Sequence, residues 1–256
     1  MSVLSYLQSR ASGAILSATE EASINTSIST LQTRLNSYFG SNVSEHFRFG
    51  SSTRGTILPR KMDYYSDIDY MVVFKEGGYS PQTYLDRLRK FVEQYYSTSD
   101  IKQSSPTIML QLNHIRFDLV PALKSVWSGY QIPNGTNGWQ DTNPNDFNST
   151  LTAKNNSELY LIKPTIRLAK FWNAQAGYVF DSFSFEKWIV NQTYWLATNQ
   201  KDYLFAVFDK LSATEATQWR NDRITRAKQI IANVRQFEAD NMPYSAEAEI
   251  KKLIPE

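Results

Sequence analysis

The sequence of 256 residues contains no cysteine, and its only histidines are His46 and His114. The lack of cysteine excludes disulfides, thiol nucleophiles and cysteine-based zinc sites, and two histidines are too few for a histidine-rich metal centre. The chain also lacks the roughly 18 consecutive apolar residues that span a bilayer. Its first seven residues do not have the pattern of a signal peptide. We therefore expect a cytoplasmic protein that makes no contact with a membrane.

An excess of charge of one sign is missing as well. The chain has 27 Lys and Arg against 25 Asp and Glu, which gives a net charge of +2. This balance does not favour a strong nucleic-acid binder, so activation by double-stranded DNA is not expected. Aromatic residues, in contrast, are plentiful, with 15 Tyr, 14 Phe and 6 Trp. Their burial offsets the entropy of the chain and indicates an ordered globular protein.

Hydrophobic periodicity predicts a mixed first half of the chain. Ile24, Ile28, Leu31, Leu35 and Phe39 recur every three or four residues, which predicts one face of a helix. That helix is expected to stop at Gly40. Alternation and β-branched residues predict strands, and Pro121 is expected to end the last of them. The predicted strands span residues 43–49, 67–74, 107–112 and 114–120, and a second helix spans residues 81–97.

The second half of the chain has a helical pattern. Residues 128–150 are rich in Gly, Asn, Pro, Ser and Thr, which predicts a long connection between two lobes. An apolar stripe follows from Leu159 to Trp172, where Pro164 is expected to end or kink a turn. Further helices are predicted at residues 185–197, 203–211 and 215–238. We therefore expect an α/β (α+β) protein with a mixed-sheet lobe in residues 1–150 and a helical lobe in residues 151–256.

Three aspartates on two predicted strands form the strongest candidate site. Asp67 and Asp69 are two residues apart, so both carboxylates project from the same side of their strand. Asp118 lies on a later strand, and if the two strands are neighbours the three carboxylates meet. Oxygen donors without Cys or His nearby suit Mg²⁺. A two-metal site of this kind binds a triphosphate, activates a hydroxyl and stabilises the leaving oxygen.

The loop before the aspartates strengthens this interpretation, because an Asp-x-Asp pair alone is commonly a solvated strand edge. Gly50 and Ser51 follow a short predicted strand and precede Arg54 and Gly55. Glycine lets backbone amides approach a phosphate, serine adds a hydroxyl donor, and a helix that begins there would complete an anion site. The alternative is a simple helix N-cap. The order Gly-Ser, Arg-Gly, Asp-x-Asp and a distant strand aspartate is more specific than any single part.

At this point the sequence resembles a known family. Residues 49–56 (Phe-Gly-Ser-Ser-Thr-Arg-Gly-Thr) and 66–74 (Ser-Asp-Ile-Asp-Tyr-Met-Val-Val-Phe) resemble the signature of polymerase β-like nucleotidyltransferases. Three further stretches resemble the cGAS/DncV-like nucleotidyltransferases, or CD-NTases: the third-carboxylate strand, a segment between the lobes and two motifs of the helical lobe. They are residues 117–122, 139–144, and 168–173 with 182–186. The resemblance covers residues 12–195 and implies a polymerase β-like fold whose helical lobe closes a nucleotide cleft.

The resemblance implies a role for each motif in the first lobe. Gly50 and Ser51 would hold the triphosphate, and Arg54 of the same loop is included among the nucleotide-binding candidates. The aspartates would act as catalytic residues by ligating two Mg²⁺ ions, for which Mn²⁺ could substitute. They are Asp67, Asp69 and Asp118.

In the helical lobe, the resemblance implies that Lys170 reaches the β- and γ-phosphates and that Ser182 assists it. Phe183 would stack on a base. The family pattern Ser-Tyr-His-Leu-Glu reads Ser-Phe-Ser-Phe-Glu here, so Ser184 with Phe185 is a competing register. A lysine on an amphipathic helix also commonly just extends its charge to solvent, which is the alternative for Lys170.

The activity implied by the resemblance is synthesis of a cyclic di- or trinucleotide from nucleoside triphosphates, with ATP among them. Such a product serves anti-phage (CBASS) signalling by switching on a separate effector. One alternative is a nucleotidyltransferase that modifies a small molecule, such as an aminoglycoside, or a protein. The helical-lobe motifs and Thr142-Asn143-Pro144 favour the cyclase over it. Another is a non-catalytic nucleotide-binding regulator, but a degenerate site is expected to have lost one of the three carboxylates.

Overall fold

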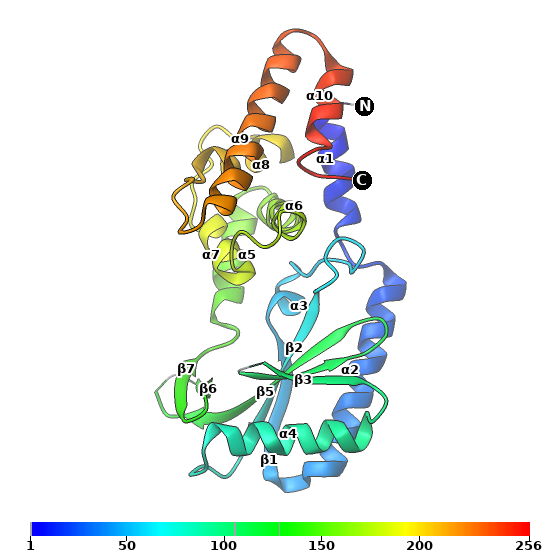
Figure 1. Ribbon diagram of the computed structural model, residues 1–256, viewed down its shortest axis with the longest axis vertical. Helices are drawn as coiled ribbons and strands as arrows, with labels where there is room; N and C mark the ends of the chain where they lie inside the picture. Colours follow the sequence, from blue (N-terminus) through cyan, green and yellow to red (C-terminus); the bar gives the residue numbers. More distant parts are fainter. Residues whose placement is uncertain (1, 105, 128) are drawn as a thin grey trace. The chain divides into compact units, whose positions relative to one another are not determined.

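A computed structural model describes residues 2–104, 106–127 and 129–256. The chain forms two compact units (Figure 1). One, here called the sheet unit, contains Leu16–Arg60 and Tyr64–Ser149, and the other, the helical unit, contains Met1–Ile15, Lys61–Asp63 and Thr150–Glu256. The sequence pattern predicts one lobe for all of residues 1–150, whereas the first helix belongs to the helical unit. This difference arises from tertiary packing, which a local pattern does not report.

The sheet unit contains a mixed sheet with the strand order β1-β2-β5-β4-β3, and β6 and β7 continue from β5. Strand β2 runs parallel to β5, and the other paired strands are antiparallel. A sheet part combined with a helical part confirms the predicted fold class. The strands are β1 (Val43–Phe49), β2 (Asp67–Phe74), β3 (Asp100–Ser104), β4 (Thr107–Gln111), β5 (Arg116–Ser125), β6 (Gly129–Asn134) and β7 (Gly138–Thr142).

Two amphipathic helices cover one face of this sheet, α2 (Ala18–Phe39) and α4 (Pro81–Tyr95). Helix α2 begins with a capping box, in which Ser17 accepts from the backbone of Glu20 and Glu20 accepts from the backbone of Ser17. It ends at Gly40, as predicted, and its predicted apolar stripe is entirely buried. Every second residue of β2 packs into the same core, namely Ile68, Tyr70, Val72 and Phe74. The aspartates of β2 therefore lie on the other face.

Among the described residues, a small apolar cluster lies on that other face of the sheet. Its buried members are Met71 and Val73 of β2 and Ala122 of β5. Aromatic and aliphatic residues of β1 and β6 pack against them, namely Phe47, Phe49, Tyr130 and Ile132. Because this cluster covers only the middle of the face, the polar ends of β2 and β5 are left to carry the candidate site.

Two expectations about the first half were wrong. Pro121 does not end β5, which continues to Ser125; neither β4, whose pairing stops at Leu119, nor β6, whose pairing starts at Leu123, pairs with the proline. The stretch 128–150 is not a long loop either. It contains the hairpin β6–β7, whose pairing closes at Asn134 and Gly138 around a three-residue turn, and the start of helix α5.

The helical unit is built from α1 and the C-terminal helices. Helix α6 includes Pro164 without being broken, because the proline lies in the first turn, where backbone N–H groups have no partner within the helix. Trp172 of α6 packs edge-on against Phe208 of α8, with ring centroids 4.9 Å apart. The helices are α1 (Val3–Gly13), α6 (Ile162–Gln175), α7 (Ser182–Val190), α8 (Gln200–Lys210), α9 (Gln218–Ala239) and α10 (Pro243–Ile250). Helix α5 (Asp146–Ser157) begins in the sheet unit and enters the helical unit at Thr150.

The helices predicted at residues 185–197, 203–211 and 215–238 correspond to α7, α8 and α9, although their ends differ. Helix α7 starts three residues earlier than expected and ends at Val190, and α10 was not predicted. Across the described residues, no helix has both the length and the apolar character needed to cross a membrane.

Candidate active site

The candidate site is built on the N-terminal ends of β2 and β5. The two strands are adjacent and parallel, which is the condition for the predicted carboxylate cluster. In their register, Asp69 lies opposite Asp118 and Asp67 lies opposite Arg116. Ile68 alternates with the aspartates and is fully buried in the core under the helices. The same pleat that buries the apolar residues therefore presents the carboxylates on one face.

The Gly-Ser loop starts directly beside Asp69. Strand β1 ends at Phe49, which pairs with Asp69, and Gly50 follows with a φ of +73°. A Cβ atom on residue 50 would lie 1.9 Å from Oδ2 of Asp69, so a larger residue cannot occupy this position without displacing the carboxylate. Glycine also tolerates this backbone conformation, which side chains rarely adopt. The sequence motif thus corresponds to a contact between the loop backbone and one of the aspartates.

The loop continues into a single helical turn, α3 (Ser51–Arg54), where the hydroxyl groups differ in their partners. Ser52 donates to the carbonyl of Phe49, and Thr53 donates to the carbonyl of Gly50. The Ser51 hydroxyl has no hydrogen-bond partner among the described residues. It is the hydroxyl of this loop that remains able to bind a ligand.

Arg54, in contrast, is only 5% exposed, and its guanidinium lies 5.8 Å from the centre of the Phe147 ring. The buried side chain packs against Phe147, and its contact with nucleotide stays a prediction. The distinction between Ser51 and Arg54 could not be made from the sequence, which placed both in the same motif.

Arg116 is a charged residue of this site to which the sequence analysis gave no role. Its Nη2 donates a hydrogen bond to Oδ2 of Asp67, and its Nε lies 2.9 Å from Oδ1 of Asp118. Burial, followed by the nearby charge of Asp67, raises the pKa of Asp118 to about 6, although Arg116 opposes the rise. The signal that could have revealed this residue is its spacing, since Arg116 and Asp118 are two apart on a strand and share its face.

The donors fit a divalent metal ion, although Arg116 now neutralises part of their charge. Among the described residues, no three His, Cys, Asp or Glu side chains form a ready-made metal-binding group. Oδ1 of Asp118 is nevertheless buried and accepts no hydrogen bond of good geometry, even from the nearby Arg116. A buried oxygen of this kind, together with a second aspartate under the Gly50 backbone, is a set of hard oxygen donors suited to Mg²⁺.

Asp118→Asn is expected to melt at the same temperature as the wild type or a few degrees higher at pH 8 without metal and nucleotide. Asparagine resembles the protonated acid, which burial favours. Since the folded-state pKa is raised, the wild type loses stability as the pH rises through about 6. The largest gain in the free energy of unfolding is roughly 3 kcal/mol, because each pKa unit corresponds to ~1.4 kcal/mol. The lost contact with Arg116 lowers this gain.

Thermal melts at pH 5 and pH 8, with and without Mg²⁺-ATP, check this prediction. The difference in melting temperature between Asp118→Asn and the wild type should be smaller at pH 5, where the Asp118 carboxyl of the folded wild type is largely protonated. With Mg²⁺-ATP the order should reverse, because ligand at 100 times its Kd stabilises the wild type by about 2.7 kcal/mol. A variant that melts several degrees lower without ligand at pH 8 would contradict a metal-binding role for Asp118 and indicate a structural one.

The other predicted residues lie on neighbouring helices of the helical unit. Lys170 is buried on α6, so it does not simply extend to solvent. Ser182 and Phe183 begin α7, which Asp181 caps by accepting from the backbone of Ser184. The structure therefore places Gly50, Ser51 and the three aspartates on adjoining elements of the sheet unit, and Lys170, Ser182 and Phe183 on helices α6 and α7 of the helical unit.

The two phenylalanines of α7 have different environments. Phe185 is 3% exposed and packs against Trp172 and Phe180, with ring centroids 6.3 Å and 4.8 Å away. Phe183 is 43% exposed, and the Lys187 ammonium lies 5.5 Å from its ring centre. Phe185 is thus the residue that packs in the core, and Phe183 is the one that is accessible to solvent. This favours the register proposed from the sequence.

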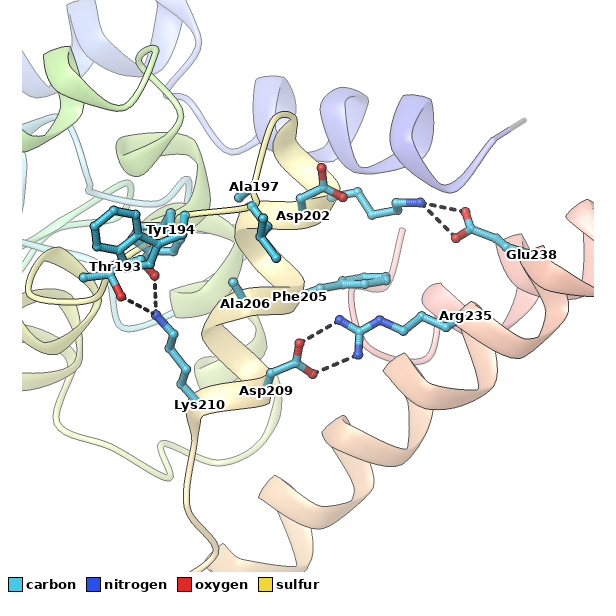
Figure 2. Close-up of a pocket in the computed structure, with 13 residues that line it drawn as sticks. Thr193, Tyr194, Ala197, Asp202, Phe205, Ala206, Asp209, Lys210, Arg235 and Glu238 are labelled. Carbon is cyan, nitrogen blue, oxygen red and sulfur yellow. Dashed lines mark hydrogen bonds and ion pairs between the residues drawn. The ribbon is translucent and has the colours of Figure 1, made fainter.

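A cavity of about 460 Å³ in the helical unit contains none of the predicted site residues (Figure 2). Its charged walls are held by ion pairs, Arg235 with Asp209 at 2.6 Å and Lys201 with Glu238 at 2.9 Å. Trp195 and Leu196 line it and are almost fully exposed. Since these charges are already paired with each other, the cavity offers a mixed surface without a net charge to attract phosphate.

Comparison with known proteins identifies the family. Residues 1–155 match the Second Messenger Oligonucleotide or Dinucleotide Synthetase (SMODS) domain, which covers more than half of the chain. The protein belongs to this family of synthetases and thereby to the CD-NTase type of nucleotidyltransferase, the class that the sequence motifs predicted. It is 26% identical over 196 residues to a "Probable cyclic nucleotide synthase" of Bacillus cereus (strain VD146). The match covers 60% of this chain and 58% of the Bacillus protein.

Solved structures of low sequence identity share the fold. CdnC of Escherichia coli MS115-1 with ATP is 16% identical, with a TM-score of 0.74, and the match covers 99% of this chain and 98% of CdnC. CdnG of Bradyrhizobium diazoefficiens with GTP is 10% identical, with a TM-score of 0.71 and coverage of 96% and 97%. The cyclic AMP-GMP synthase DncV of Vibrio cholerae is 11% identical, with a TM-score of 0.63 and coverage of 82% and 68%.

Proposed function

We propose that the protein is a Mg²⁺-dependent synthase, also able to use Mn²⁺, that joins nucleoside triphosphates into a cyclic di- or trinucleotide. ATP is expected to be one of its substrates. The observation that carries the proposal is the packing of Gly50 against Asp69, which in turn lies opposite Asp118. This approach supports the proposal, because transfer of a nucleotidyl group needs phosphate-binding groups beside metal-binding carboxylates.

In this proposal, Asp67, Asp69 and Asp118 hold two metal ions on one face of the sheet. When bound, the ions would lower the pKa of the attacking hydroxyl and offset the charge that develops on the leaving pyrophosphate. Ser51 donates its hydroxyl to a phosphate oxygen, and Gly50 leaves space for the phosphate to approach the backbone. The protein's own share of catalysis is therefore to orient the triphosphate against the carboxylates.

Residues of the helical unit are assigned to substrate binding. Lys170 is proposed to contact the β- and γ-phosphates, with Ser182 as a second donor. Phe183 is proposed to stack on a base, because its ring is accessible while that of Phe185 is buried. An aromatic face stacks on any base with little preference, so this contact would add affinity more than base selectivity.

The partners and the setting are inferred from the relatives. The Vibrio cholerae structure is titled a cyclic AMP-GMP synthase, and one CdnC structure is a complex with a HORMA protein. We propose that this protein makes a second messenger in the cytoplasm, that the product switches on a separate effector in anti-phage (CBASS) defence, and that double-stranded DNA is not its activator. The balanced net charge supports the last point.

Incubation with four labelled nucleoside triphosphates and either Mg²⁺ or Mn²⁺ tests the proposed activity. We expect a product that contains two or three nucleotides and resists phosphatase, because a closed ring has no terminal phosphate. The Asp69→Asn variant serves as the blank. A labelled product that forms only when an aminoglycoside or a protein acceptor is added would refute cyclisation and indicate acceptor modification.

A further inference from the structure

Arg116 bridges the two strands of the candidate site. Its Nη2 donates to Oδ2 of Asp67 on β2, while its Nε lies 2.9 Å from Oδ1 of Asp118 on its own strand, β5. The side chain is 16% exposed, as is that of Asp118, so solvent screens these contacts only partly. A single guanidinium thus neutralises charge on two of the three carboxylates.

The contacts of Arg116 use oxygens that the proposed metal ions need. A divalent cation that binds Asp67 and Asp118 would be placed within a few ångströms of the guanidinium, and two cations that close repel strongly in a partly buried site. Arginine remains charged at any relevant pH, so it cannot relieve the repulsion by losing a proton. The side chain must therefore move away from at least one carboxylate when the metal arrives.

We propose that Arg116 is a positioning residue that acts as an internal counter-cation, holding the metal-free carboxylates together and competing with the divalent ion. This inference rests on the proposed function, because it takes the aspartates as the metal ligands. Arg116 then sets the metal concentration at which the site fills. It also keeps Asp67 and Asp118 from repelling each other before substrate binds.

The competition has two opposite consequences. Without metal, loss of the guanidinium leaves carboxylate repulsion uncompensated, so the fold loses stability. With metal, the same loss removes a rival cation, so the site binds the divalent ion more tightly. If Arg116 only oriented the aspartates, its removal would weaken metal binding instead of strengthening it.

The test measures Mn²⁺ binding to the full chain by the electron paramagnetic resonance signal of free Mn²⁺. Arg116→Met keeps much of the side-chain length and removes the charge, and it is expected to lower the Kd for Mn²⁺ at least about tenfold. Its metal-free melting temperature should fall, and saturating Mn²⁺ should restore most of the loss. Arg116→Lys keeps a charge but cannot bridge two carboxylates with a planar fork, so its Kd should be intermediate.

Arg48→Met is the matched control. Arg48 lies on β1 opposite Tyr70, on the face of the sheet away from the aspartates, and has no ion pair among the described residues. Removing the same charge there should leave the Kd within about twofold, because Arg48 is exposed on the opposite face and solvent screens its charge. The proposal is overturned if Arg116→Met has the same Kd for Mn²⁺ as Arg48→Met, or if it binds Mn²⁺ more weakly than the wild type does. If Arg116→Met does not fold, an unchanged Kd in Arg116→Lys overturns it.

Asp118→Asn separates failure of this inference from failure of the proposed function. If the wild type binds Mn²⁺ no better than Asp118→Asn does, the proposed metal site is wrong, and the inference about Arg116 falls with it. If Asp118→Asn loses Mn²⁺ binding while Arg116→Met matches Arg48→Met, the metal site stands and the role of Arg116 is refuted.

Discussion

Asp69→Asn is expected to lower the rate of product formation at least about a thousandfold, or ~4 kcal/mol of transition-state stabilisation. Asparagine keeps the shape that packs under Gly50, so the fold should persist, but a neutral amide is a poor ligand for a hard divalent ion. Asp67→Asn and Asp118→Asn should lose as much, because the three act together. Pyrophosphate release with ATP and Mg²⁺ measures the effect.

The control for this loss is Asp100→Asn on β3, an exposed aspartate whose ion pair is with Lys102 at 3.0 Å. An exposed pair of this kind contributes at most about 1 kcal/mol to stability, so turnover and melting should stay close to wild type. Turnover near the wild-type rate in any of the three site variants would show that the proposed metal site is misplaced.

Gly50→Ala is the second substitution with a large expected effect. The new Cβ would lie 1.9 Å from Oδ2 of Asp69 and would sit on a backbone with a φ of +73°. Either the loop or the carboxylate must move, so we expect turnover to fall at least about a hundredfold, because a shift of ~1 Å in reacting groups costs that much. Strain of roughly 1–3 kcal/mol should also lower the melting temperature.

Gly55→Ala separates the steric overlap with Asp69 from the backbone strain of a positive φ. Gly55 has a similar φ of +70°, but nothing lies within 4 Å of a Cβ placed there. It should lose some stability and keep most of its activity. Pyrophosphate assays and thermal melts of both variants decide the matter. If Gly50→Ala remained as active as Gly55→Ala, the contact between residue 50 and Asp69 would have no importance for catalysis.

Features governed by local pattern were predicted well from the sequence. Strand β2 has the predicted bounds of 67–74, because its β-branched and aromatic side chains are typical of a strand. Side chains alternate between the two faces of a strand, and Ile68 faces the core under the helices. The same alternation places Asp67 and Asp69 on one face. The buried stripe of α2 was also correct, since its apolar residues are spaced for one side of a helix.

Features that depend on tertiary partners were missed. Pro121 was expected to end a strand, but it is tolerated where neither β4 nor β6 pairs with it. The turn residues before α5 suggested a loop, whereas Ile132 of β6 packs on the cluster around Met71 and Val73. Arg116 lay on the expected face, but its bridge between Asp67 and Asp118 depends on the register of two strands distant in sequence.

The path of the chain determines which parts of it can fold alone. It passes from one unit to the other after Ile15, Arg60, Asp63 and Ser149, so neither unit is a continuous stretch. Helix α1 packs on α6, α8 and α10, and its Tyr6 hydroxyl donates to the carbonyl of Ile254. A fragment limited to residues 1–155, the family match, would keep α1 and lose these partners. The segment that matches the family model therefore contains the whole sheet unit but only part of the helical unit, and truncation after residue 155 would leave the apolar side of α1 facing water.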